Sequence, residues 1–364
     1  MTNGSASPTK GKFTAMLICW ILGIGSAISW NSLMTIGDYY YKLVLTIVLQ
    51  PFALGTMTIL FYKEATINTK RNLIGYILFV RALLCSLWIT PYIGICAIVG
   101  AFGVASALVQ GGMTGDLSFM CPEFIRSFLA GLAASGVLTS ALRLMTKAVF
   151  RKSNDGERNG AMLFLGITTF VEFLCTLLYA FFFPKLPIVK FYRSKAALEG
   201  SQTVSADLAV AGIQTEQNEE DGDDTQQQER LSNKQLFFQN IDYALEVFLG
   251  HLVTLSIFPG FLFENTGKHQ LGSWSYGWSS STIFIDTAFY FTTKYGDQGW
   301  MILLTSFLGV SNGYLTVCIF TDAPKGYKGP EQNALGNMLT LCLLCGIFAG
   351  GALGWLWLIG NESF

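Results

Sequence analysis

Several ionisable side chains lie inside long apolar runs of the sequence, where a charge is costly and therefore suggests a function. Glu172 is the most interior carboxylate. Because a carboxyl group at low dielectric can take up and release a proton, Glu172 is a candidate proton-coupling residue. The alternative is that Glu172 is a structural partner of an arginine. Other ionisable residues inside apolar runs are Arg81, Arg143, Asp242, Glu246, Asp286 and His251. A lone histidine on an apolar helix, such as His251, is typical of a packing residue.

A second group of polar residues follows one helical face between residues 92 and 115. Gly103, Ser106, Gln110 and Thr114 recur at spacings of three and four, which places them on one side of a helix. The Gln110 amide can donate and accept hydrogen bonds at once. Gln110 and Ser106 are therefore candidate substrate-binding residues. An interhelical hydrogen bond without a ligand is an equally weighted alternative.

Residues 13–36 contribute a third group. Trp30 and Met34 are four residues apart on one face, and Asn31 is adjacent. The indole of Trp30 could stack on a planar solute, with Met34 and Asn31 beside it, so all three are candidate substrate-binding residues. Indole rings also belong at membrane interfaces and in cores, and packing is the alternative role for Trp30.

The composition defines the environment of these residues. Of 364 residues, 51% are hydrophobic and only 13% are charged, whereas an average soluble domain is about a quarter charged. A polytopic membrane protein in a lipid bilayer is therefore predicted. The formal net charge of -1 provides no basic field for nucleic acid, so we exclude that class of partner.

The sequence lacks the signatures of catalytic and metal sites. Its eight cysteines are scattered, mostly in apolar runs, which is typical of small buried residues. Cys342 and Cys345 form a CxxC without a nearby histidine or second pair. No phosphate loop, HExxH or GxSxG occurs in a suitable context. We therefore expect a non-enzyme with no cofactor and no metal, for which protons are the candidate coupling ion.

Nine segments contain the roughly 20 predominantly apolar residues that a spanning helix needs. Residues 274–293 are polar in their first half and include Asp286, so we predict a partial, interfacial or re-entrant element there. The predicted fold is an all-α polytopic membrane protein with about nine full spans and one partial element. The nine spans are 13–36, 43–62, 72–90, 92–115, 124–149, 160–183, 240–262, 299–321 and 333–359.

Loop charges and composition predict the orientation and the domains. Lys and Arg are enriched in cytoplasmic loops, which places residues 63–71, 185–195 and 325–328 on the cytoplasmic side together with the N-terminus. The basic residues between 147 and 158 argue against this assignment. The predicted parts are a cytoplasmic N-terminus (1–12), a six-helix N-terminal bundle (13–183), an acidic disordered cytoplasmic loop (184–239) and a shortened C-terminal bundle (240–364).

Several blocks in a fixed order along the chain resemble the equilibrative nucleoside transporter family, particularly its plant branch. The resemblance covers almost the whole chain, and it is the ordered set rather than any single block that is specific. The blocks are Gly23-Ile-Gly-Ser-Ala-Ile-Ser-Trp30-Asn31, Gln110-Gly-Gly-Met-Thr-Gly-Asp116, Phe128-Leu-Ala-Gly131, Pro184-Lys-Leu-Pro, Ile257-Phe-Pro259-Gly and Ser311-Asn-Gly-Tyr314.

This resemblance implies a fold related to the major facilitator superfamily, with eleven helices and a cytoplasmic N-terminus. It implies purine and pyrimidine nucleosides as substrates, moved by alternating access. Plant members look like proton-coupled importers, that is, symporters, of the plasma membrane. Trp30, Met34 and Gln110 match positions that contact nucleoside in the family, while Asn312 matches a signature position with a packing role.

The chain also departs from the family pattern. An Asp-x-x-x-Arg pair that engages the ribose from helix eight in the family does not occur between Ser273 and Ile285, and the chain is short near Tyr41 to Leu43. The alternative to a nucleoside transporter is therefore a truncated, transport-incompetent family member that at most associates with intact relatives. A carrier for another small organic solute is a third reading.

Overall fold

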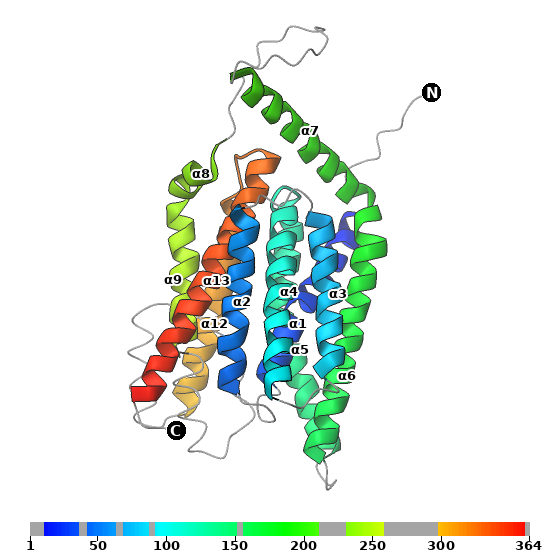
Figure 1. Cartoon of the computed structure of the whole chain (residues 1–364), viewed down its shortest axis with the longest axis vertical. Coiled ribbons are helices and arrows are strands. Elements are labelled where there is room, and N and C mark those ends of the chain that lie inside the picture. Colours follow the sequence, from blue (N-terminus) through cyan, green and yellow to red (C-terminus); the bar gives the residue numbers. More distant parts are fainter. Residues whose placement is uncertain are drawn as a thin grey trace.

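The structure of this protein, a computed structural model, describes residues 11–35, 42–62, 68–86, 92–150, 156–210, 231–257 and 298–360. These residues form helices joined by short turns, and no strand occurs among them (Figure 1). The all-α fold predicted from the sequence is confirmed. The predicted partial element at 274–293 lies outside the described residues.

Each of the nine predicted spans coincides with a helix. The helices are α1 (Lys12–Thr35), α2 (Lys42–Tyr62), α3 (Asn68–Ser86), α4 (Tyr92–Ser118), α5 (Pro122–Val149), α6 (Gly156–Leu177), α7 (Pro187–Val210), α8 (Asn233–Gln239), α9 (Ile241–Ile257), α12 (Gln298–Asp322) and α13 (Gly329–Gly360). Between α6 and α7 the chain continues through a π-helical turn, η2 (Leu178–Phe182), and a 3-10 turn, η3 (Phe183–Lys185).

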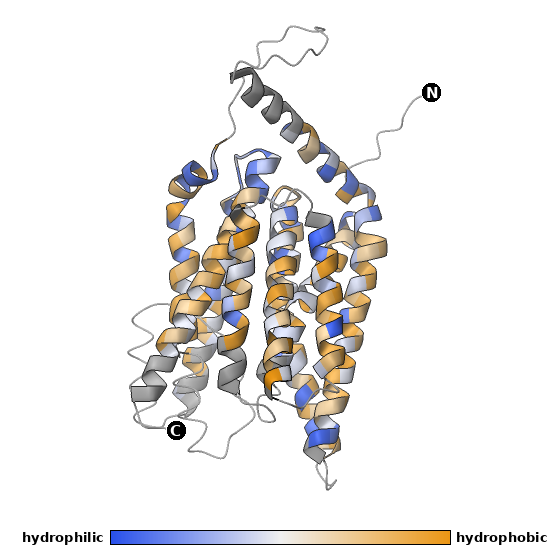
Figure 2. Cartoon of the chain, in the orientation of Figure 1, coloured by the Kyte–Doolittle hydropathy of each residue, from blue (hydrophilic) through white to orange (hydrophobic). Residues whose placement is uncertain are grey.

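Length and apolar composition allow several of these helices to cross a membrane. Among the described residues five segments qualify, and a shorter apolar helix covers Val48–Phe61. Hydrophobic residues dominate the middle of the bundle, whereas polar residues gather at the end where α7, α8 and the start of α13 lie (Figure 2). The five segments are Lys12–Ser32, Cys96–Ser118, Pro122–Val149, Arg158–Lys185 and Gly329–Gly354.

The helices pack as two groups that meet along α13. The N-terminal half comprises α1 to α6, in which α1 packs on α5 and both α2 and α3 pack on α4 (Figure 1). The C-terminal half comprises α8 to α13, in which α9 packs on α13. Helix α13 also packs against α4 and α2 and so joins the halves. Helix α7 runs across one end of the bundle, which we call the α7 end.

Glycines permit the closest helix crossings. A Cβ at Gly23 of α1 would overlap the carbonyl oxygen of Phe128 in α5, and one at Gly131 would overlap that of Trp20. On α13, a Cβ at Gly346 would overlap the carbonyl oxygen of Phe248 in α9. Because helices in lipid associate mainly through close packing of small residues, these contacts hold each half together.

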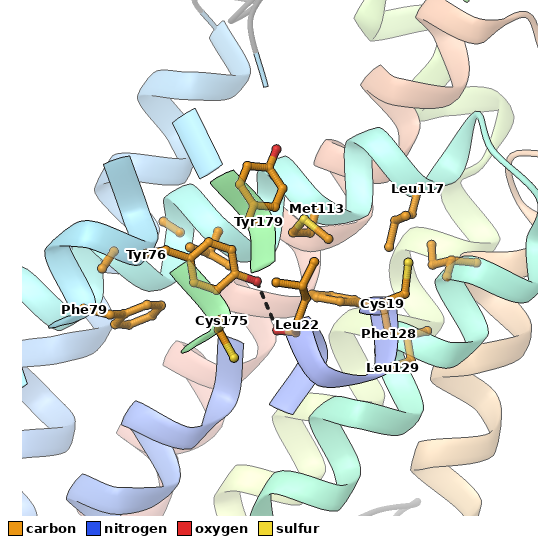
Figure 3. Close-up of a cluster of buried hydrophobic side chains, with 14 of the residues drawn as sticks. Cys19, Leu22, Tyr76, Phe79, Met113, Leu117, Phe128, Leu129, Cys175 and Tyr179 are labelled. Carbon is orange, nitrogen blue, oxygen red and sulfur yellow. Dashed lines mark hydrogen bonds between the residues drawn. The ribbon is translucent and has the colours of Figure 1, made fainter. Parts of the chain in front are cut away.

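A buried aromatic cluster fills the N-terminal half (Figure 3). The rings of Tyr76 and Tyr179 have centroids 5.6 Å apart, and Tyr179 stacks on Phe183 at 5.6 Å. The Tyr76 hydroxyl donates to the Leu22 carbonyl at 3.0 Å. This bond satisfies a polar group inside an apolar core and ties α3 to α1.

The structure differs from the predicted disordered loop at both ends of 184–239. Residues Pro187–Val210 form α7, and Asn233–Gln239 form α8, which begins with a capping box between Ser232 and Gln235. The acidic composition indicated disorder, but tertiary contacts of α7 with α13 and α1 stabilise a helix there. Residues 211–230 lie outside the described part.

Gly23→Ala should destabilise the protein, because the added Cβ overlaps the backbone of α5. Overpacking of this kind costs about 1–3 kcal/mol, so the melting temperature in detergent should fall. Gly166→Ala is the matched control, since nothing lies within 4 Å of a Cβ at Gly166. Equal melting temperatures for the two variants would contradict the tight α1–α5 crossing.

Candidate functional site

Glu172 lies fully buried on α6 and faces α1. The Ser29 hydroxyl of α1 donates to Glu172 Oε1 at 2.5 Å, while Oε2 has no hydrogen-bond partner. One turn further along α6, the Cys175 thiol approaches the Ile21 carbonyl at 3.5 Å. The structure thus pairs Glu172 with a serine and not with an arginine, and it leaves one carboxyl oxygen available for a proton or a donor.

The other candidates on α1 lie close to Ser29 in sequence but make different contacts. The Trp30 ring is half-buried and packs against the hydrophobic core. The Asn31 amide donates to Ser135 Oγ on α5 at 2.6 Å. Met34 belongs to α1, but its side chain lies outside the described part. Asn31 therefore links α1 to α5.

On α4, Ser106 is buried and Gln110 is half-buried. Thr114, one turn beyond Gln110, hydrogen-bonds through Oγ1 to Thr340 Oγ1 of α13 at 2.7 Å. Because residues four apart share a helix face, Gln110 lies on the side of α4 that is directed at the C-terminal half. Among the described residues no hydrogen bond joins its side-chain amide to a partner.

Helices α4 and α13 meet so closely that glycine is required on both sides, and the Gly111-xxx-Gly115 spacing is typical of such contacts. A Cβ at Gly115 would overlap the Asn333 amide, and one at Gly336 would overlap the Ser118 hydroxyl. We call this contact, with the Thr114–Thr340 hydrogen bond, the α4–α13 seam. It closes the bundle between the two halves near the α7 end.

A network of buried charged and polar side chains surrounds the seam. The Arg71 guanidinium of α3 donates to Asn337 Oδ1 of α13 at 2.8 Å. Asp116 of α4 forms an ion pair of 2.6 Å with Arg193 of α7. The Arg193 guanidinium carbon also lies 5.6 Å from the centroid of the Phe183 ring. The two arginines therefore have different roles: Arg71 connects the two halves, and Arg193 connects α7 to the N-terminal half.

The structure brings some predicted residues together and separates others. Ser106 and Gln110 share a face of α4, whereas the Asn31 amide of α1 is directed at Ser135 of α5. His251 hydrogen-bonds the Val247 carbonyl of its own helix at 2.9 Å, consistent with the predicted packing role. No group of three potential metal ligands occurs in the described part.

Sequence reasoning did not identify the residues of the seam and its network as a unit. The sequence placed Arg71 and Arg193 only in basic loops, at 63–71 and 185–195. The available signal was the glycine spacing on α4, which indicates a close approach by another helix. The identity of that helix required the tertiary structure.

Comparison with known proteins identifies the family. A profile described as "Nucleoside transporter" matches residues 95–289. Arabidopsis thaliana proteins named equilibrative nucleotide transporter 3 and equilibrative nucleotide transporter 5 are 58% and 55% identical, over 97% and 99% of this chain and 96% and 98% of their own. The chain therefore belongs to the equilibrative nucleoside transporter family, a family of transporters.

A solved structure supports the fold independently. A proton:xylose symporter of the major facilitator superfamily, bound to 6-bromo-6-deoxy-D-glucose, matches with a TM-score of 0.61 at 8% identity, over 98% of this chain and 90% of that chain. The fold is thus like that of the major facilitator superfamily. The alignment with transporter 3 runs over 405 positions, more than the 364 residues here, so that relative has segments that this chain lacks.

Asp116→Asn should strongly lower the melting temperature in detergent, because it leaves the Arg193 guanidinium without its ionic partner. Breaking one side of a fully buried ion pair costs about 3–5 kcal/mol; because the Arg193 side chain is 22% exposed, we expect a cost below that range but above the roughly 1 kcal/mol of an exposed pair. The double variant with Arg193→Gln should recover part of the loss. Asp322→Asn, in the exposed pair with Lys325, is the control and should cost no more than about 1 kcal/mol. If the fall in melting temperature of the double variant equalled the sum of the falls of the two single variants, Asp116 and Arg193 would not be coupled.

Proposed function

We propose that this protein moves purine and pyrimidine nucleosides across a membrane by alternating access between its two halves. Family membership supports transport. The observation that carries the mechanism is the α4–α13 seam, which joins the halves through the neutral Thr114–Thr340 bond one turn from Gln110. The Thr114–Thr340 bond itself can open without exposing a charge, which suits a carrier that rearranges its halves.

Substrate binding in this proposal involves residues of both α1 and α4. Trp30 and Met34 contact the base, Gln110 hydrogen-bonds the solute, and Asn31 and Ser106 complete the site. The lack of a described partner for the half-buried Gln110 amide supports its role, since a polar group at depth needs a hydrogen-bond partner. The amide can pair with donors and acceptors on a base or a ribose.

The proposed orientation places the α7 end in the cytoplasm and the protein in the plasma membrane. Lys185, Arg193 and Lys325 all lie in or beside the elements at this end, whereas the α5–α6 junction lies at the opposite end (Figure 1). An excess of Lys and Arg on one side favours the cytoplasm. The N-terminus is then cytoplasmic too.

Proton coupling through Glu172 is a separate part of the proposal. Its Oε2 is buried without a partner, and Ser29, on the helix that carries Trp30, donates to Oε1. Uptake of a proton by Glu172 would therefore change a contact of the substrate-binding helix. This arrangement would make the carrier a symporter.

The deciding experiment is uptake of labelled adenosine and uridine by uptake-deficient cells that express this chain, with surface abundance measured in parallel. Saturable uptake that nucleosides compete for supports the proposal. Movement of another compound without nucleoside competition would instead indicate a carrier for a different organic solute. Acid-stimulated uptake would support symport.

One observation favours a second candidate function. The alignment with transporter 3 is longer than this chain, because that relative has segments that are missing here. This difference is consistent with a truncated, transport-incompetent protein that associates with intact family members. Normal surface abundance without uptake of either nucleoside would select this candidate over transport.

Gln110→Ala should raise the KM for nucleoside uptake about tenfold, since loss of one good hydrogen bond costs about 1.4 kcal/mol. Surface abundance should not change. Gln239→Ala, which removes an exposed amide at the end of α8, is the control. Unchanged uptake kinetics at equal abundance would remove Gln110 from the site.

Glu172→Gln should make uptake equal at acidic and neutral outside pH. The amide still accepts a hydrogen bond from Ser29 but cannot take up a proton. Ser26→Ala, which alters another buried hydroxyl of α1, should retain the wild-type ratio. Retention of the ratio by Glu172→Gln would exclude Glu172 as the coupling group.

A further inference from the structure

Helix α7 is anchored at its start to the N-terminal half. It follows α6 directly through η2 and η3. Arg193 is paired with Asp116 of α4 at 2.6 Å, and the Tyr192 ring meets Phe124 of α5 edge-on at 6.5 Å. The first turns of α7 must therefore move with the N-terminal half.

Further along, α7 contacts the first turn of α13, in the other half (Figure 1). Glu199 Oε2 accepts a hydrogen bond from the Gly329 backbone N–H at 2.8 Å. A Cβ at Gly329 would lie 2.9 Å from Cβ of Ala196, and one at Gly200 would lie 3.3 Å from Pro330 Cγ. The two helices touch here without room for larger side chains.

The Glu199 contact suits the start of a helix. The first N–H groups of α13 have no partner within their own helix, and a carboxylate near a helix N-terminus is stabilising. Glu331 of α13 serves the neighbouring N–H groups of Lys328 and Leu231, at 3.2 and 3.0 Å. Those two bonds lie within the C-terminal half, whereas the Glu199 bond connects the first turn of α13 to α7.

We propose that α7 is a latch, formed by Ala196, Glu199 and Gly200 against Gly329 and Pro330, that stabilises the state in which the α4–α13 seam is closed. Separation of the halves at this end breaks the Glu199–Gly329 bond, because α7 is anchored to the N-terminal half and Gly329 belongs to the C-terminal half. The latch thus adjusts the balance between the open and closed states from outside the substrate site. It does not depend on which solute is carried.

The first test measures opening of the seam directly. Thr340 is buried at the seam, so Thr340→Cys reports opening through its labelling rate with a maleimide, followed by peptide mass spectrometry. Exposed Cys85 is the internal reference. Adding Glu199→Ala should raise the labelling rate at position 340 several-fold, and Glu199→Gln, which keeps an acceptor, should raise it less. Lys190→Ala, an exposed change on α7, should have no effect.

A labelling rate at position 340 that is equal for Glu199→Ala and Lys190→Ala would overturn the latch.

A second test applies if the Glu199→Ala variant fails to fold. Ala196→Cys with Gly329→Cys places two Cβ atoms 2.9 Å apart. A disulfide spans about 3.8 Å between Cβ atoms, so α7 and α13 must separate slightly here for the bond to form. Oxidation should link them and slow labelling at position 340, and reductant should reverse both. Unchanged labelling in the linked protein would also overturn the proposal. Neither readout requires uptake, so failure of nucleoside transport remains distinguishable.

Discussion

Close backbone contact at glycine is the constraint on which this structure depends. Lipid is as apolar as the helix surfaces, so burial from water does not draw helices together, and small residues must admit close packing instead. The crossing of α1 with α5 requires Gly23 and Gly131, and that of α9 with α13 requires Gly346. The same device, at Gly115 and Gly336, joins the two halves.

The crossings within a half and the crossing between halves differ in the polar contacts that accompany them. Helix α7 is joined to α4 of the N-terminal half by the ion pair between buried Asp116 and half-buried Arg193, whose separation would leave the Asp116 carboxylate at low dielectric. Across the seam, two threonine hydroxyls pair, and Arg71 meets an amide. The threonine pair can therefore separate at lower cost than an ion pair, whereas Arg71 needs a new hydrogen-bond partner when the halves separate.

The α1 helix connects the proposed proton and substrate sites. Ser29 holds Glu172, and the next residue along the helix is Trp30. On the other side of the molecule, α13 connects the seam at Thr340 to the α7 contact at Gly329. A movement of either helix would thus reach two distant places, because a helix transmits displacement as a rigid body.

The sequence alone predicted nine of the described helices and the membrane character of the chain, because apolar length is a local property. It also indicated the family through ordered motifs. Only the tertiary structure decided that Glu172 meets Ser29 and that Asn31 meets Ser135. It also showed that Glu199 lies in a helix, α7, and contacts the first turn of α13. Those partners are far apart along the chain, and side-chain type does not specify which of several buried groups a helix will face.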